Sequence, residues 1–212
     1  MKLYDTVWRE ASAEQTIERS RFIAHVRPVG SREEAEAFIA RIRKEHKDAT
    51  HNVPAMVIGD KMQLQWASDD GEPQGTAGAP VVQLLTSAGI TNTAIVVTRY
   101  FGGVKLGTGG LVRAYTSSAK LGLEAAGTCS VEQRLCLSVG LDYPHLARLR
   151  KLAGDDFEIL DLSYGEKIQA ELSCQPENRA RLESLLADLT AGRFDILHEE
   201  IRAVRHLIKI NG

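Results

Sequence analysis

Apolar residues follow two different spacings in the first half of the chain, and these spacings predict its elements. They alternate with polar residues, or form short unbroken runs, in segments typical of strands at residues 3–8, 21–26, 52–58, 62–66 and 94–97. They recur every three or four positions in segments typical of helices at residues 31–46, 79–87 and 108–126. The run at 94–97 is apolar throughout, which predicts a central strand. The first half therefore predicts a mixed α/β domain.

The helix at residues 31–46 carries the clearest start signal. Ser31 is a good N-cap residue, and Glu34 follows three positions later, which completes the pattern of a capping box. One apolar stripe at helical spacing follows, formed by Ala35, Phe38, Ile39 and Ile42. We expect this helix to bury the stripe and to end near His46.

The second half has its own order of predicted strands and helices. Strands are predicted at residues 135–141, 157–162, 168–174 and 194–204, and helices at residues 144–152 and 177–189. Pro144 and Pro176 stand where the first turn of a helix tolerates proline. The order βαββαβ is that of a ferredoxin-like domain. The predicted fold class is α+β, with one domain at residues 1–130 and a second at residues 131–212.

Charge limits the kinds of partner that the chain can bind. Residues 1–130 carry 15 positive and 14 negative side chains, and residues 131–212 carry 11 and 14. Neither part has the basic excess typical of proteins that bind nucleic acid mainly through phosphates. Apolar residues make up 43% of the chain and charged residues 25%, as in ordinary globular proteins. Any contact with RNA would therefore need a local patch of charge.

The chain shows no pattern of a membrane or secreted protein. Its apolar runs are far shorter than the roughly 20 residues that span a bilayer, and the first residues lack the apolar core of a signal peptide. Cys129, Cys136 and Cys174 have no spacing typical of zinc sites, so each is expected to be a reduced, buried residue. We expect a cytoplasmic protein that makes no contact with a membrane.

A glycine-rich segment between a predicted strand and a predicted helix is the most unusual feature. Five glycines stand within nine positions: Gly102, Gly103, Gly107, Gly109 and Gly110. Free N–H groups at the start of a helix can bind an anion, and Arg99, Lys105 and Arg113 add positive charge. The segment is neither a Walker A loop nor a dinucleotide fingerprint. The alternative is architectural, because glycines also permit a sharp turn and tight packing of a helix on a sheet.

An acidic turn and two histidines are weaker candidates. Asp69, Asp70 and Glu72 could hold Mg²⁺, although their spacing is not that of a calcium loop and acidic turns are common on surfaces. His46 and His51 flank a helix-to-strand junction without a third metal ligand nearby in the sequence. No arrangement typical of nucleophilic catalysis is found, so we predict no catalytic residue, no metal and no cofactor.

Three segments of the first half resemble signature segments of the IMPACT/YigZ family. They are Ser-Arg-Phe-Ile at residues 20–23, Asp-Asp-Gly-Glu-Pro-Gln-Gly-Thr-Ala-Gly at 69–78, and the segment from Arg99 to Tyr115. The resemblance covers residues 1–128, and the tail resembles the smaller domain of bacterial members. It implies a first domain like domain 2 of ribosomal protein S5 and a second like the last domain of the translocating elongation factor. Similar eukaryotic proteins regulate translation under amino-acid starvation.

Two hypotheses of function follow. In the first, the protein is a non-catalytic binding module linked to translation or stress response, with the ribosome, RNA or a translation-related protein as partner. Its candidate site comprises Arg99, Tyr100, Gly102, Gly103, Lys105, Gly107, Thr108, Gly109, Gly110, Arg113 and Tyr115, with Tyr100 or Tyr115 stacking on a base. In the alternative, Asp69, Asp70 or Glu72 faces this site and holds Mg²⁺ in an enzyme acting on a phosphorylated small molecule or nucleotide. The sequence assigns no oligomeric state.

Overall fold

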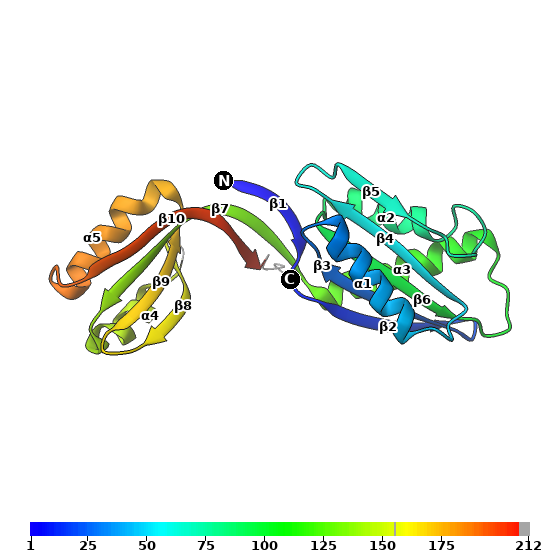
Figure 1. Cartoon of the computed structure of the whole chain (residues 1–212), viewed down its shortest axis with the longest axis horizontal. Coiled ribbons are helices and arrows are strands. Elements are labelled where there is room, and N and C mark those ends of the chain that lie inside the picture. The colour runs from blue at the N-terminus through cyan, green and yellow to red at the C-terminus, as the bar shows by residue number, and fades with distance from the viewer. Residues whose placement is uncertain (155, 208–212) are drawn as a thin grey trace. The chain divides into compact units, whose positions relative to one another are not determined.

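A computed structural model of the chain describes residues 1–154 and 156–207, and it is an α+β structure of two units (Figure 1). The N-terminal unit comprises Leu3–Val131 together with residues 205–207, and the C-terminal unit comprises Met1–Lys2 and Glu132–Val204. The sequence pattern predicts a division at residues 130 and 131. It does not predict that Met1–Lys2 belong to the C-terminal unit, or that residues 205–207 belong to the N-terminal unit.

The sheet of the N-terminal unit is antiparallel throughout. Its strands lie in the order β2 (Ala11–Ile17), β3 (Ser20–Pro28), β6 (Thr93–Tyr100), β4 (His51–Ile58) and β5 (Leu64–Ala67). The prediction that residues 94–97 form a central, buried strand is confirmed. Strand β2 was not predicted. It lies at the edge of the sheet, and its small and polar residues show no apolar pattern.

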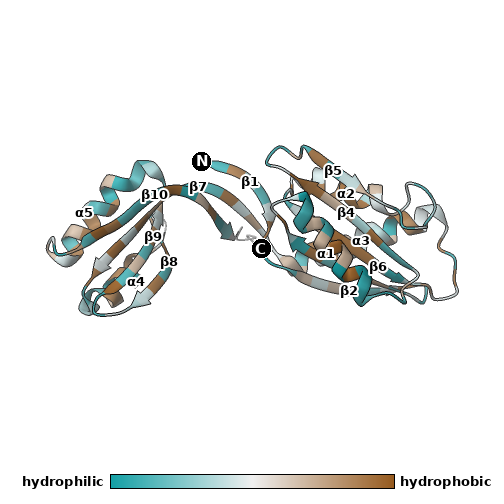
Figure 2. Ribbon diagram, in the orientation of Figure 1, coloured by the Kyte–Doolittle hydropathy of each residue, from teal (hydrophilic) through white to brown (hydrophobic). Residues whose placement is uncertain are grey.

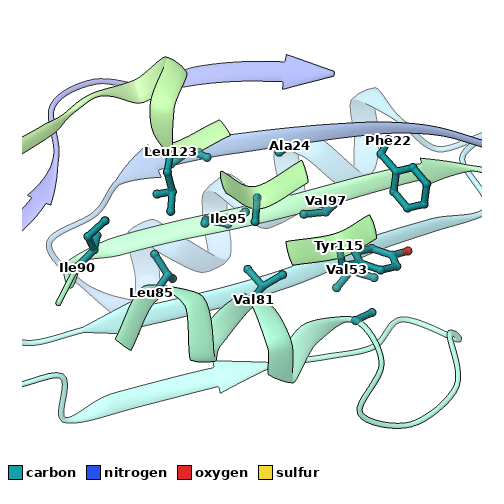
Figure 3. Packing of buried hydrophobic residues seen from close by; sticks show 14 of the residues in the cluster. Phe22, Ala24, Val53, Val81, Leu85, Ile90, Ile95, Val97, Tyr115 and Leu123 are labelled. Atoms are coloured by element: carbon teal, nitrogen blue, oxygen red, sulfur yellow. The ribbon is translucent and has the colours of Figure 1, made fainter. Parts of the chain in front are cut away.

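Helices cover both faces of this sheet. Helix α1 (Arg32–Glu45) packs on one face, where Ala94 and Val96 of β6 point, and helices α2 (Gly78–Ser87) and α3 (Gly107–Ala126) pack on the other, where Ile95 and Val97 point. Figure 3 shows this second face, with Leu85 of α2 and Tyr115 of α3 against the sheet. Figure 2 shows α1 with both hydrophobic and hydrophilic residues and mostly hydrophobic residues along β6. Burial on both faces explains why β6 is apolar without alternation.

The start of α1 agrees with its predicted cap, with one difference. The Ser31 hydroxyl accepts a hydrogen bond from the Glu34 backbone N–H at 3.3 Å. The Glu34 carboxylate accepts from the N–H of Gly30 at 2.7 Å. A standard capping box would use the N–H of Ser31 itself. Ala35, Phe38, Ile39 and Ile42 are buried as predicted, and His46 caps the other end.

The C-terminal unit has the predicted order βαββαβ. Its elements are β7 (Thr128–Leu141), α4 (Leu146–Leu152), β8 (Glu158–Tyr164), β9 (Ile168–Cys174), α5 (Arg179–Thr190) and β10 (Asp195–Leu207), and its strands lie in the order β10-β7-β9-β8. Strand β7 also pairs with β1 (Lys2–Val7). A separate core around Leu137, Leu149 and Phe157 stabilises this unit. Short turns at Tyr143–His145 and Pro176–Asn178 hold the two prolines just before the helices.

Candidate functional site

The glycine-rich segment is the loop that leads from β6 into α3. A Cβ atom on Gly102 would lie 2.0 Å from the carbonyl of Arg19, so only glycine fits there. Gly103 and Gly107 have φ angles of +86° and +69°, a region that glycine adopts with little strain. Backbone geometry therefore accounts for three of the five glycines.

Gly109 has no such structural reason. It lies in the first turn of α3, and an added Cβ would meet only the guanidinium of Arg113, at an ordinary distance of 3.7 Å. No side chain caps the start of α3, where Leu106 occupies the N-cap position. The first turn of this helix thus exposes backbone N–H groups beside a glycine that the fold itself does not require.

Two clefts flank the loop. The first cleft has a volume of about 390 Å³, and residues from β4, the acidic turn, β6 and α3 line it, among them His51, Glu72, Arg99, Phe101, Lys105 and Thr108. The second cleft has a volume of about 480 Å³, and Glu18, Lys105, Gly110, Arg113 and Ser117 are among its lining residues. Lys105 borders both clefts, whereas Arg99 and Arg113 each border one. The three predicted cations therefore do not form a single patch.

Arg99 and Tyr115 are buried partners of Glu72. The Glu72 carboxylate oxygen Oε1 accepts hydrogen bonds from Arg99 Nη1 at 2.7 Å and from the Tyr115 hydroxyl at 2.8 Å. The guanidinium carbon of Arg99 lies 5.4 Å from the ring centres of both Phe22 and Phe101. Burial and the bond to Glu72 raise the pKa of the Tyr115 hydroxyl. The idea that Tyr115 stacks on a base is therefore wrong, because its ring is fully buried in the core.

The acidic turn does not face the site as a group. Asp69 accepts three backbone N–H bonds, from Gly75, Ala77 and Gly78 at the start of α2. Burial acts to raise the pKa of Asp69, but these bonds outweigh it and hold the pKa below its ordinary value. Asp70 accepts from the Asn52 N–H at 2.7 Å and from Arg43 at 3.0 Å.

Of the three carboxylates, Glu72 alone lines the first cleft. Over residues 1–154 and 156–207, no three His, Cys, Asp or Glu side chains lie together as metal ligands would. The metal-dependent alternative has less support, because Asp69 and Asp70 already accept hydrogen bonds from other residues of the protein.

Sequence reasoning missed Phe101 of the first cleft, and it considered His51 only together with His46 as a weak candidate for a metal site. Phe101 is 46% exposed and forms part of the cleft wall, whereas the sequence favours Tyr100, whose hydroxyl lies 2.9 Å from His46 Nδ1. His51 lies at the start of β4, and its Nδ1 is 2.7 Å from the carbonyl oxygen of Asp70. An aromatic residue beside two glycines was a visible signal for Phe101. No local signal places His51 beside the glycine-rich loop, because β4 and the loop meet only in the folded sheet.

The sequence matches known proteins over most of its length. Residues 18–123 match the Impact N-terminal domain, and residues 139–193 match a domain of unknown function, DUF1949. The chain belongs to the IMPACT family. IMPACT family member YvyE of Bacillus subtilis is 38% identical over 209 residues, which cover 96% of each chain. YigZ of Escherichia coli is 34% identical over 187 residues, which cover 86% of this chain and 91% of YigZ.

The fold is also found in an experimental structure. A crystal structure described as that of a hypothetical protein is 32% identical and aligns with a TM-score of 0.59 over 94% of this chain and 98% of its own. Among the described helices, none is both long and apolar enough to cross a membrane.

Proposed function

We propose that this protein is a non-catalytic binding protein with a translation-related regulatory role, and that it contacts RNA or the ribosome through its glycine-loop face. This face comprises the exposed residues Phe101, Lys105, Thr108, Gly109 and Arg113. Membership of the IMPACT family supports the link to translation, since the resemblance implies ribosome-related domains and translational regulation in similar proteins.

The observation that carries the proposal is the pair of exposed cations beside the uncapped start of α3. Lys105 and Arg113 are both exposed, and neither has an ion-pair or side-chain hydrogen-bond partner within residues 1–154 and 156–207. Many other arginines of the surface are paired, such as Arg21 with Glu14. Free cations, free backbone N–H groups and an exposed aromatic ring are the features that bind a phosphate and a base.

Co-sedimentation with ribosomes and with total RNA across a salt series tests this proposal. We expect binding that falls with rising salt and is weakened in the double variant Lys105→Ala/Arg113→Ala. The matched control is Lys61→Ala/Lys120→Ala, which removes two exposed cations from other parts of the same unit that have no ion-pair partner in the part of the chain that the structure describes. If both double variants bind as wild type does, or if wild type does not bind at low salt, the proposal is wrong.

A further inference from the structure

The first cleft offers more specific chemistry than the rest of the glycine-loop face. Its lining includes the exposed ring of Phe101 together with Glu72 and His51. Its volume of about 390 Å³ lies within the range of roughly 300–1,000 Å³ that small-molecule sites occupy. All of its lining residues belong to the N-terminal unit.

Glu72 has one carboxylate oxygen that accepts no hydrogen bond from another residue of the described ranges 1–154 and 156–207. Its side chain is only 4% exposed, and both of its hydrogen bonds, from Arg99 and Tyr115, reach the same oxygen, Oε1. Among the described residues, no donor reaches the other oxygen, Oε2. Oε2 is not among the fully buried polar atoms that lack a partner, so solvent reaches it, and a ligand O–H or N–H group could replace water as its donor.

His51 provides a second acceptor at the same place. A backbone carbonyl only accepts hydrogen bonds, so the 2.7 Å contact with Asp70 requires that His51 Nδ1 carries the hydrogen. In the neutral imidazole, Nε2 then has a free lone pair. Nε2 lies 3.7 Å from Oε1 of Glu72, too far for a hydrogen bond, so this nitrogen lies beside the Glu72 carboxylate.

Two neighbouring acceptors suit a ligand with two neighbouring hydroxyl groups, and the remaining features of the cleft suit one base and one phosphate. The 2′ and 3′ hydroxyls of a ribose are such a pair, and carboxylates recognise them in other nucleotide sites. The ring of Phe101 offers a stacking surface. Lys105 supplies one cation, which suits a single phosphate rather than the several phosphates of a continuous RNA backbone.

We propose that the first cleft binds one ribonucleotide with free 2′ and 3′ hydroxyls, which donate to Glu72 and His51 while the base lies against Phe101 and the phosphate near Lys105. Such a nucleotide exists free in solution or at the 3′ end of an RNA chain. This inference rests on the proposed function, because it places the ligand on the same glycine-loop face.

Isothermal titration calorimetry with adenosine 5′-monophosphate and its 2′-deoxy form tests the ligand. We expect the ribonucleotide to bind at least tenfold more tightly, because the deoxy form leaves an acceptor unpaired. Phe101→Ala and His51→Gln should each weaken binding of the ribonucleotide tenfold or more. Trp66→Ala, which removes an exposed aromatic residue outside the first cleft, should not. Equal affinity for the two nucleotides, or no effect of both cleft variants, would overturn the inference.

A second experiment with RNA distinguishes the two sources of the ligand, a free nucleotide and the 3′ end of an RNA chain. A short oligoribonucleotide with a free 3′ end is compared with the same oligonucleotide ending in a 3′-phosphate. Preference for the free end supports an RNA terminus as the natural ligand, whereas tight binding of the free nucleotide alone supports a small metabolite and contradicts the RNA-binding proposal. If the oligonucleotides bind equally, lose affinity in Lys105→Ala/Arg113→Ala, and the free nucleotide does not bind, the proposed function survives and this inference fails.

Discussion

At the scale of single residues, the glycine-rich loop combines structural and exposed positions that look alike in the sequence. Gly102 approaches the backbone of Arg19, whereas Gly109 has free space around it. A sequence pattern cannot separate these cases, because the neighbour that matters lies more than 80 positions away along the chain. The same limit applies to Arg99 and Tyr115, because the sequence does not show that both bond to Glu72.

Alanine substitutions separate the two kinds of glycine. We expect Gly102→Ala to destabilise the N-terminal unit by about 3 kcal/mol, because the backbone of Arg19 and Ser20 must move to admit a Cβ atom. Gly109→Ala should leave stability unchanged or raise it by up to about 1 kcal/mol, since alanine favours a helix. Urea denaturation followed by fluorescence measures both, because Trp8 and Trp66 lie in this unit.

Gly109→Ala also has a functional outcome. If a ligand approaches the backbone at the start of α3, the added methyl group weakens RNA binding in a protein of wild-type stability. Wild-type binding by this variant would show that the ligand does not approach this position.

At the scale of elements, sequence patterns predict most of the fold and part of the site. The cap and stripe of α1, the central strand β6 and the βαββαβ order are confirmed, because each depends on local signals. Strand β2 and the first half of β7 were missed. Strand β2 owes its place to pairing with β3, which a local pattern does not contain. Lys105 and Arg113 are exposed as a binding role requires, while the placement of Phe101 and His51 in one cleft follows only from the meeting of β4, β6 and α3.

Asp69 is expected to stabilise the start of α2. Its carboxylate accepts the N–H groups of Gly75, Ala77 and Gly78, which have no helical partner of their own. Asp69→Ala should lower the free energy of unfolding by about 1–3 kcal/mol. Asp60→Ala, an exposed aspartate in another turn of the same unit, is the control and should change it much less. Equal stability of the two variants would contradict the capping role.

The packing of β3 against the end of α1 should make stability depend on pH. Burial lowers the pKa of His25 to about 4, and neighbouring charges modify it: His46 and Arg41 lower it further, while Glu45 and Glu10 oppose them. The unfolded chain binds this proton near pH 6.5, so the folded state loses stability as the pH falls from about 6.5 towards 4.

From this shift we expect a loss of about 2 kcal/mol between pH 7.5 and pH 5. His25→Gln should remove that loss, whereas His198→Gln, at an exposed position of β10, should keep it. Urea denaturation at the two pH values measures the difference. A wild-type pH dependence in His25→Gln would show that another group causes it.

At the scale of the whole molecule, charge does not favour binding to a polyanion. The formal net charge is −2, and several arginines of the surface, such as Arg21, Arg41 and Arg179, are paired with carboxylates. Binding to RNA must therefore come from the few exposed cations of the glycine-loop face, which predicts few phosphate contacts and a shallow dependence on salt.

The most direct test of this account is the slope of RNA affinity against salt concentration, measured by filter binding on a logarithmic scale. Each phosphate contact contributes roughly 0.7–0.9 to the slope, so Lys105→Ala/Arg113→Ala should reduce it by about 1.5. Lys61→Ala/Lys120→Ala should leave it unchanged. An equal slope in wild type and in Lys105→Ala/Arg113→Ala would contradict the claim that this face binds RNA.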